Sequence, residues 1–361
     1  MDLPVMPPLR PMLAKSVKGV PPADSVEGGL SYEPKWDGFR AIVFRDGDEV
    51  VIGSRSTKEL TRYFPEVVSA ARQSLPERCV VDGEIVVALE GRLDFDALSQ
   101  RIHPAESRVK LLSEQTPASL VVFDLLAVDD EALLDAPFSE RRDRLDQVLA
   151  DASAPVHVTR RTSDAAEAER WFDQFEGAGL DGVVAKRLDG TYVPNGRTML
   201  KVKHSRTADV VVAGYRLHKT STPERPLLGS MLLGLYADDG RLQHVGVCAS
   251  FSEARRAELL AELQQLRVDF SDHPWGAWQD EAAQASGRLP GGQSRWTGTK
   301  DLSFVPLAPK RVVEVGYEHM EGDRFRHTAQ FKRWRDDREP ESCGYAQLEE
   351  VVGYDLSDVL A

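Results

Sequence analysis

The chain has 361 residues, 42% hydrophobic and 29% charged, a composition typical of globular proteins that excludes disordered and fibrous classes. At about 150 residues per domain, this length predicts roughly two domains. No apolar run approaches the roughly 20 residues that a membrane span needs. The start MDLPVMPPLRPMLAKS, with an early acid and several prolines, does not resemble a secretory signal. We therefore expect a protein without a membrane segment that stays in the cytoplasm.

Cysteine usage and net charge narrow the class further. Cys79, Cys248 and Cys343 lie far apart without a Cys-x-x-Cys pair, which excludes a disulfide framework and a four-cysteine zinc site. The net charge of −13 argues against a general nucleic-acid coat, because phosphate contacts need Lys and Arg. Local basic patches on an acidic body remain compatible with it.

Short β-branched runs alternate with amphipathic stretches through the first two-thirds of the chain. The runs predict strands over residues 39–44, 49–52, 79–89, 120–128, 156–159 and 182–186. The amphipathic stretches predict helices over residues 65–75, 95–102, 139–149 and 164–175. Asp46-Gly47 is a hairpin turn signal between the first two strands. Hairpins mixed with helices favour an α+β domain with antiparallel sheets.

The pattern changes after Lys203. Strands are predicted over residues 208–217, 231–236, 243–249, 312–317 and 325–331, with one helix on which Leu259, Leu260, Leu263 and Leu266 share a face. Several strands with a single helix fit a small β-barrel of the oligonucleotide-binding (OB) type. We place the domain boundary near residues 204–207. Residues 269–300 are expected to form a surface loop, and whether they order on DNA is left open.

Two glycine-rich segments resemble phosphate-binding motifs, but neither meets the full requirements of its motif. Residues 177–182 match G-x-G-x-x-G, yet a helix is predicted before them and a strand after them, the reverse of a dinucleotide site. Residues 291–300 resemble a phosphate loop, but the second glycine is misplaced and Thr299 precedes Lys300 where the motif has Gly-Lys. The eight histidines show no metal-ligand spacing.

A series of motifs resembles the covalent nucleotidyltransferases, the superfamily of DNA ligases, RNA ligases and mRNA capping enzymes. Lys35-Trp36-Asp37-Gly38 matches its first motif, K-x-D-G. The others follow in the family's order: Ser54-Arg55, Asp82-Gly83-Glu84, Val122-Phe123-Asp124-Leu125, Asp181 to Lys186, Leu200 to Lys203, and Arg326 to Arg338. Because the ordered matches extend over nearly the whole chain, they identify it as a member of the superfamily.

Within the superfamily, the chain is most similar to the ATP-dependent DNA ligases, in particular the short bacterial enzymes of the actinobacterial ligase C group. The resemblance implies an α+β, ATP-grasp-like nucleotidyltransferase domain with antiparallel sheets over residues 1–205. It implies a C-terminal OB-fold β-barrel over residues 206–361. We expect no separate N-terminal DNA-binding domain, because too little chain precedes Lys35 to hold one.

The implied reaction adenylates Lys35, transfers AMP to a nick 5′-phosphate and seals it to the 3′-hydroxyl. A free lysine, with a pKa of about 10.4, is almost wholly protonated at neutral pH and cannot attack ATP. Positive charge from Lys201, Lys203 and bound Mg²⁺ is expected to favour the neutral amine and to offset charge on the transferring phosphoryl group. Lys35, Lys201 and Lys203 are therefore the expected catalytic lysines.

The resemblance also implies the binding residues. Asp181 and Glu84 would serve Mg²⁺, with Mn²⁺ as a possible substitute, and Glu84 would also accept from the ribose 2′-hydroxyl. Phe123 would stack on the purine, and Glu33 would read the adenine amino group. Further nucleotide contacts are expected from Arg40, Arg55, Lys186, Lys201 and Lys203. Pyrophosphate would be oriented from the second domain by Lys332, Arg333, Arg335 and Asp336.

The expected partner is nicked double-stranded DNA, with repair proteins as possible further partners, and the protein is expected to be a monomer that acts in repair. Basic residues of the second domain would hold DNA phosphates in a salt-dependent way, namely Arg206, Arg216, Lys219, Arg225, Lys310 and Arg311. Two alternatives stay open: an RNA ligase or GTP-using capping-type enzyme, and a non-catalytic OB-fold nucleic-acid-binding protein.

Overall fold

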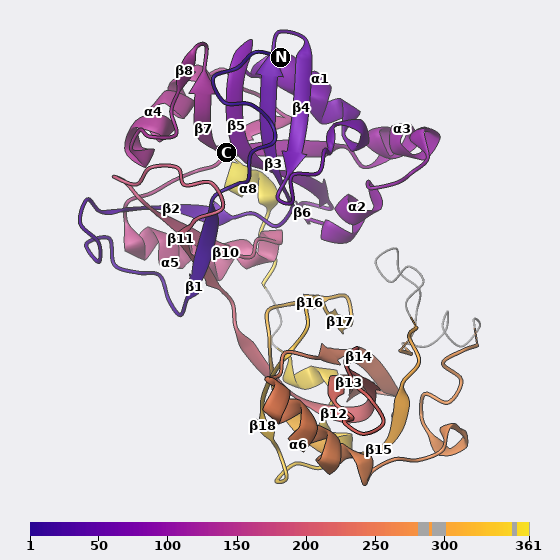
Figure 1. The fold of residues 1–361 in the computed structure, drawn as a ribbon. Coiled ribbons are helices and arrows are strands. Elements are labelled where there is room, and N and C mark those ends of the chain that lie inside the picture. Colours follow the sequence, from indigo (N-terminus) through magenta and orange to yellow (C-terminus); the bar gives the residue numbers. More distant parts are fainter. Residues whose placement is uncertain (281–288, 291–300, 349–351, 361) are drawn as a thin grey trace. The chain divides into compact units, whose positions relative to one another are not determined.

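The computed structural model describes residues 1–280, 289–290, 301–348 and 352–360. The chain divides into two units, one of Met1–Lys203 with Val351–Ala361 and one of His204–Glu350 (Figure 1). No helix among the described residues is long and apolar enough to cross a membrane.

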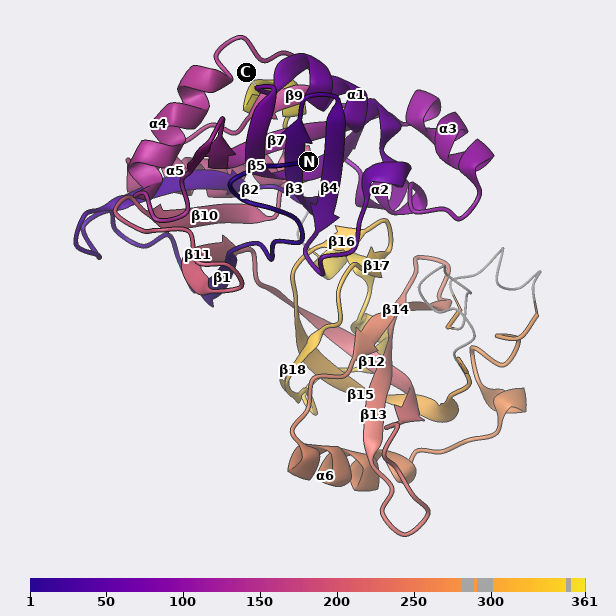
Figure 2. The same ribbon diagram turned by 45° about the horizontal axis from the view of Figure 1, so that its top comes forward.

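The larger sheet of the first unit has seven strands (Figure 2). Its main order is β4 (Glu49–Ser54), β3 (Phe39–Asp46), β5 (Arg78–Leu89), β7 (Ala118–Val128) and β8 (Glu131–Ala132), with β6 (Arg92–Leu93) on β5 and β9 (Val156–Val158) on β7. Residues of β3 alternate between two cores: Ala41 and Val43 lie in the core with α1, and Ile42 and Phe44 lie in a second one. The helices of this part are α1 (Pro65–Ser74), α2 (Phe95–Gln100), α3 (Glu106–Gln115) and α4 (Phe138–Val148).

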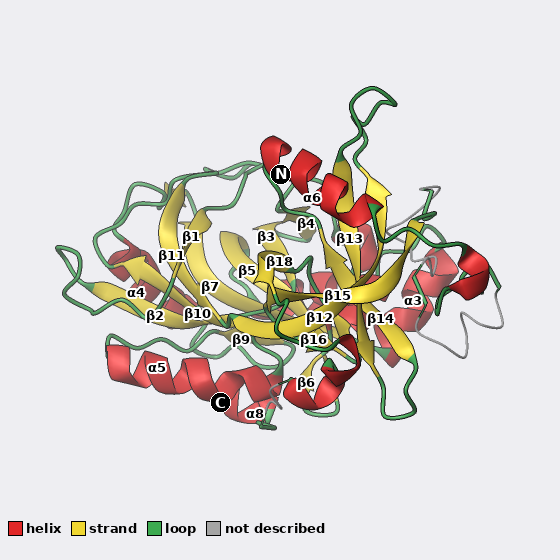
Figure 3. Cartoon of the chain, turned by 90° about the horizontal axis from the view of Figure 1, so that it is seen from below, coloured by secondary structure: helices red, strands yellow, loops and turns green. Residues whose placement is uncertain are grey.

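The smaller sheet of this unit has the order β1 (Leu13–Val17), β11 (Arg197–Lys203), β10 (Gly182–Arg187) and β2 (Leu30–Lys35). Helix α5 (Ala165–Gln174) covers one face along β2 and β10, where Ala168 and Trp171 pack on Tyr32, Val183 and Ala185 (Figure 3). The opposite face of these strands is therefore left for polar side chains. A 3₁₀ turn, Phe175–Ala178, precedes β10, as expected from the rejection of a dinucleotide site at residues 177–182.

Residues 352–360 return to the first unit, which differs from the expected second domain of 206–361. Leu356 and Val359 of α8 (Leu356–Leu360) are buried in the core beneath α5. Arg160 donates hydrogen bonds to the carbonyls of Asp358 and Val359, and Leu356 N–H donates to Gly91 O. The tail belongs here because its apolar side chains complete this core.

The second unit is a five-stranded antiparallel sheet with the order β14 (Leu242–Cys248), β13 (Leu228–Tyr236), β12 (Arg206–Leu217), β15 (Val305–Tyr317) and β18 (Gln330–Trp334). A bridge between Cys248 and Ala329 joins its two ends, and α6 (Glu253–Gln264) packs Leu259, Leu260 and Leu263 on the core. This arrangement confirms the expected OB-type barrel.

Two expectations for this unit need correction. The strand expected over residues 325–331 is interrupted: β17 (Arg324–Phe325) pairs with β16 (Met320–Glu321) as a small hairpin, and β18 begins only at Gln330. Residues 269–280 are also not a simple surface loop, because Trp275 is fully buried and its Nε1 donates to Leu242 O at 2.7 Å. Residues 281–288 and 291–300, including the stretch that resembles a phosphate loop, lie outside the described residues.

Candidate active site

Strand register places the predicted lysines on one face of the smaller sheet. Lys35 of β2 lies opposite Gly182 of β10, which lies opposite Lys203 of β11. Two residues along the strands, Val184 lies opposite Glu33 on one side and Lys201 on the other. Because side chains alternate along a strand, all of these lie on the face opposite α5. The backbone register therefore brings Lys201 and Lys203 to the same face of the sheet as Lys35.

Asp181 joins the two lysines that flank it. Its Oδ2 lies 2.5 Å from Lys35 Nζ and 3.2 Å from Lys203 Nζ, and the side chain is 4% exposed. Its N–H donates to Lys35 O at 2.9 Å, which ties the start of β10 to the end of β2. Gly182 follows with φ of +135°, and a Cβ there would lie 2.1 Å from Val202 O. Only glycine fits, so the Asp-Gly pair is needed to bring the carboxylate to the lysines.

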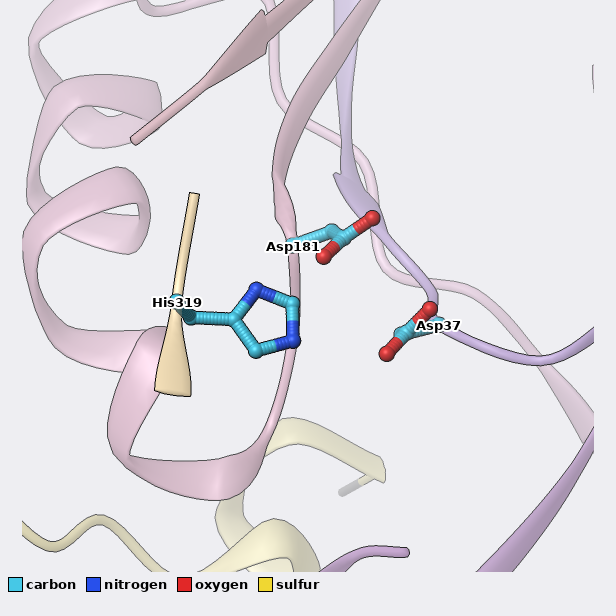
Figure 4. A group of neighbouring side chains, drawn as sticks. All are labelled: Asp37, Asp181 and His319. Carbon is cyan, nitrogen blue, oxygen red and sulfur yellow. The ribbon is translucent and has the colours of Figure 1, made fainter. Parts of the chain in front are cut away.

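The turn after Lys35 packs closely against strand β5 of the larger sheet. A Cβ on Gly38 would lie 2.2 Å from Ile85 O, so glycine lets this turn approach β5 closely. Asp37, between Lys35 and Gly38, directs its carboxylate toward that of Asp181, with oxygens of the two within 4.8 Å (Figure 4). Asp37 was not predicted as a metal ligand, although it is part of the K-x-D-G motif.

Arg40 is held by a fully buried carboxylate. Its Nε and Nη2 donate to the two oxygens of Asp82 at 2.6 and 2.7 Å, and Tyr192 Oη donates to the same carboxylate at 2.6 Å. The guanidinium carbon lies 4.5 Å from the centre of the Phe123 ring. This brings Arg40 to the ring expected to stack on the purine.

Glu84 lies directly opposite Arg40 on the neighbouring strand β5. Burial raises the pKa of its carboxyl to about 7, against the opposing effects of the Arg40 and Lys35 charges and of a hydrogen bond from the Gly38 backbone. A carboxyl group beside Lys35 that changes charge near neutral pH is typical of a functional site.

A second group of predicted residues surrounds the buried ammonium of Lys186. Its Nζ lies 2.7 Å from Glu33 Oε2 and donates to Phe123 O at 3.1 Å. It also lies 4.7 Å from the centre of the Phe123 ring and 4.6 Å from that of Phe138. Glu33, Phe123 and Lys186, which are far apart in sequence, thus converge where the two sheets of the first unit meet.

Arg55 does not join these groups. It follows the end of β4, is exposed, and has no hydrogen bond or ion pair with another described residue. Its expected contact with ribose or phosphate stays a prediction.

The predicted residues near the C-terminus lie on β18 and in the turn after it, in the second unit. Arg335 donates to both oxygens of Asp209 at 2.8 and 3.0 Å and to Asp337 at 2.9 and 3.0 Å, which fixes its position. Arg333 donates to Glu314 at 2.8 Å. Lys332 and Asp336 are exposed.

Several side chains that support the site were not predicted. Trp36 Nε1 donates to Thr159 Oγ1 at 2.8 Å, which anchors the residue next to Lys35. Asp124 forms a fully buried ion pair with Arg141 at 2.8 Å, next to Phe123. Asp82 and Asp124 lie inside quoted motifs and within predicted strands. An acidic residue in an otherwise apolar strand was the signal that could have identified them as supporting residues. Thr159 and Tyr192 carried no such signal.

Comparison with known proteins agrees with the motifs. The ATP dependent DNA ligase domain family matches residues 11–203, and the ATP dependent DNA ligase C terminal region matches residues 224–338. DNA ligase C2 of Mycolicibacterium smegmatis is 58% identical over 351 residues, which cover 97% of this chain and 96% of that protein. DNA ligase C of Mycobacterium tuberculosis is 57% identical over 364 residues, which cover 100% and 99%.

One solved structure, from a study of Lig E DNA ligases, superposes with a TM-score of 0.52. The superposition covers 90% of this chain and 99% of that chain, at 16% sequence identity. At that identity the similarity bears on the fold alone, and it agrees with the two-part architecture described above.

Proposed function

This chain belongs to the ATP-dependent DNA ligases, and on that premise we propose that Lys35 forms a covalent bond to AMP as the first step of nick sealing. The observation that carries the proposal is the pairing of Lys35 Nζ with the buried Asp181 carboxylate at 2.5 Å, in a row with Lys203. The family and the two ligases named above give no support to the RNA ligase, capping or non-catalytic alternatives.

The first step is attack of the Lys35 amine on the α-phosphorus of ATP. A P–N bond forms, the bond to the β-phosphate oxygen breaks, and pyrophosphate leaves. The amine attacks through its lone pair, so Lys35 must first give up a proton. Asp181 Oδ2, which accepts a hydrogen bond from Nζ, holds the nitrogen in place and is positioned to take that proton. Lys201 and Lys203 on β11, which β10 separates from β2, supply positive charge to the same face, where the phosphates must lie.

The next two steps use the same AMP. The nick 5′-phosphate takes AMP from Lys35, and the 3′-hydroxyl then displaces AMP to form the phosphodiester. Both steps transfer a phosphoryl-type group and depend mainly on positioning and on cations near the phosphates. The substrate we propose is therefore nicked duplex DNA.

The carboxylates of the site fit a divalent cation. Asp37 and Asp181 present oxygens within 4.8 Å of each other, and Glu84 is a further hard oxygen donor near Lys35. Asp181, Glu84 and Asp37 would hold Mg²⁺, or Mn²⁺ in its place. When bound, the ion supplies charge that offsets the negative charge developing on the transferring phosphoryl group.

The adenosine would lie against Phe123. Its ring would stack on the purine, Arg40 and Glu84 would contact the ribose, and Glu33 would meet the adenine edge. Arg55 is proposed to contact ribose or phosphate from its exposed position after β4. For the second unit we propose that Lys332, Arg333, Arg335 and Asp336 orient pyrophosphate during the first step.

We propose a role in DNA repair within the cytoplasm, where bacterial DNA lies, and a monomeric enzyme. The domain division we propose is 1–205 with the C-terminal tail, and 206 to about 350 for the barrel. Repair proteins as partners stay a prediction.

The test is direct labelling of the polypeptide. Purified protein is mixed with Mg²⁺ and ATP labelled in the α-phosphate, then denatured, and covalent label is measured. We expect label with wild type and with Lys110→Ala, an exposed lysine on α3, and none with Lys35→Ala. Label from GTP instead of ATP, or label retained by Lys35→Ala, would contradict the proposal. Mass measurement beforehand shows whether the protein is already adenylated.

A further inference from the structure

We propose that Lys186 sets the purine selectivity of the nucleotide site by binding one oxygen of the Glu33 carboxylate and leaving the other oxygen, a hydrogen-bond acceptor, presented to the base. The inference deepens the proposed function, since it concerns the same ATP site. Lys186 acts through Glu33 and is therefore a positioning residue. Its effect is predicted on the choice between purines and not only on the rate.

The first observation is an unpartnered buried oxygen. Glu33 is 3% exposed, and its Oε2 is paired with Lys186 Nζ at 2.7 Å. Its Oε1 is buried and has no hydrogen-bond partner among the described residues. Glu33 stands two residues before Lys35 on the same face of β2, so this oxygen belongs to the active-site face. A buried acceptor without a donor is costly, so the site favours a ligand that brings an N–H group.

The second observation is that Lys186 is fixed in place. It is 4% exposed, its Nζ donates to Phe123 O, and it lies against the rings of Phe123 and Phe138. These contacts hold the ammonium at one position, and the ammonium in turn holds the Glu33 carboxylate. Because the same ammonium binds the Phe123 backbone and the Glu33 carboxylate, it fixes the reading group relative to the proposed stacking ring.

The chemistry of the purine edge then decides selectivity. Adenine carries an amino group at position 6, which can donate to Glu33 Oε1. Guanine and hypoxanthine carry a carbonyl there, and a carbonyl facing a carboxylate places two acceptors together without a proton between them. The site therefore favours adenine as long as Lys186 holds the Glu33 carboxylate in this position.

Removing the ammonium would release the Glu33 side chain. The carboxylate loses the partner that fixes its position, so its free oxygen is no longer held opposite the amino group of adenine. Loss of Lys186 is thus expected to relax the choice between adenine and 6-oxo purines as well as to weaken ATP binding.

The experiment compares ATP with inosine triphosphate, which differs from ATP at position 6. Formation of the covalent nucleotide adduct is followed by intact mass for wild type, Lys186→Met and the control Lys110→Met. We expect the ratio of kcat/KM for ATP to that for inosine triphosphate to fall at least tenfold in Lys186→Met, with most of the change in KM. The control should keep the wild-type ratio.

This ratio separates the proposed role from a structural one. Loss of folded protein lowers the rates with both nucleotides equally and leaves the ratio unchanged. A ratio in Lys186→Met within twofold of wild type would overturn the inference, whereas wild type that forms no adduct with ATP would instead overturn the proposed function. If Lys186→Met does not fold, Glu33→Gln decides: its amide can donate to a carbonyl, so its ratio should also fall at least tenfold, and an unchanged ratio overturns the inference.

Discussion

Tyr192 donates a hydrogen bond of 2.6 Å to Asp82, the fully buried carboxylate that holds Arg40 through two hydrogen bonds. The tyrosine oxygen also accepts a hydrogen bond from the Met12 backbone at 3.0 Å. Tyr192 lies between β10 and β11, and thus connects the segment that joins two strands of the smaller sheet to an arginine of the larger one. Tyr192, which lies outside every quoted motif, therefore positions Arg40, which the family resemblance implies as a nucleotide contact.

We predict that Tyr192→Phe raises the KM for ATP several-fold and leaves kcat for adenylation within about twofold. The ring still fills its site, but Asp82 keeps only its two hydrogen bonds from Arg40, and the buried Met12 N–H loses its partner, which costs about 1–3 kcal/mol of stability. Adenylation kinetics and thermal unfolding check both effects. Tyr63→Phe is the matched control, because no hydrogen bond of its hydroxyl to a described residue is present. An unchanged KM would show that Arg40 is positioned without Tyr192.

We predict that the kcat/KM of adenylation rises with pH through about 7, and that Glu84→Gln flattens this part of the profile. Burial raises the pKa of Glu84 to about 7, so the free enzyme carries a neutral group below that value and a carboxylate above it. A carboxylate is the better acceptor for the ribose hydroxyl and the better metal ligand. A profile with the same inflection in Glu84→Gln would assign the titration to another group.

The raised pKa of Glu84 makes the stability of the folded protein fall with rising pH, whereas the activity is predicted to rise. Because the folded-state pKa is raised above 4.5, the protonated form is favoured by folding, and its contribution is complete below about 4.5 and lost as pH rises through about 7. Glu84→Gln removes a group that is unfavourable when charged. Its melting temperature relative to wild type should therefore be higher at pH 8 than at pH 5, as calorimetry at the two values can test.

We predict that Gly38→Ala lowers the adenylation rate at least a hundredfold. A Cβ at this position would lie 2.2 Å from Ile85 O, and both are backbone-bound groups that cannot simply turn away. The turn must move from β5, and it carries Lys35 and Asp37 with it, which removes the alignment on which the reaction depends. Gly19→Ala is the control, because nothing lies within 4 Å of a Cβ there. Normal labelling of Gly38→Ala would mean that the close approach is not needed.

The sequence predicts the site better than it predicts the supports around it. Lys35, Lys201 and Lys203 stand in motifs with period-two spacing, and antiparallel register brings such positions to one face. Tyr192 and Thr159 were missed because their contacts are set by packing between segments that pair only in the folded chain. Trp275 was missed for a related reason: a segment rich in Gly, Pro and Trp has no periodicity, yet its indole fills the barrel core.

The end of the second domain was also not predictable from the sequence, because it depends on packing between segments far apart in the chain. Residues 352–360 follow the barrel in sequence, and only their burial on the first unit shows where they belong. We predict that Leu356→Ala lowers the stability of the first unit by about 2–5 kcal/mol, because the leucine is 3% exposed in its core. Thermal unfolding measures the effect. Val352→Ala, at a position 86% exposed, should have none, and equal behaviour of the two variants would show that the tail does not stabilise the unit.

The last prediction concerns DNA. Of the six basic residues expected to hold phosphates, Arg225 is paired with Glu253 at 2.5 Å and Arg311 with Glu262 at 2.9 Å, and Arg216 donates to backbone carbonyls. Lys219 and Lys310 are exposed and have no hydrogen bond or ion pair with a described residue, so they can contact phosphate without first breaking an ion pair.

We therefore expect sealing by the wild type to fall steeply between about 50 and 200 mM salt. Lys219→Ala and Lys310→Ala should each weaken binding to nicked DNA and reduce the slope of log K against log salt by about 0.9, the value for one phosphate contact. Lys110→Ala serves as the control for loss of one exposed charge. Binding titrations at four salt concentrations give the slopes, and unchanged slopes in both variants would place the DNA contacts on other residues.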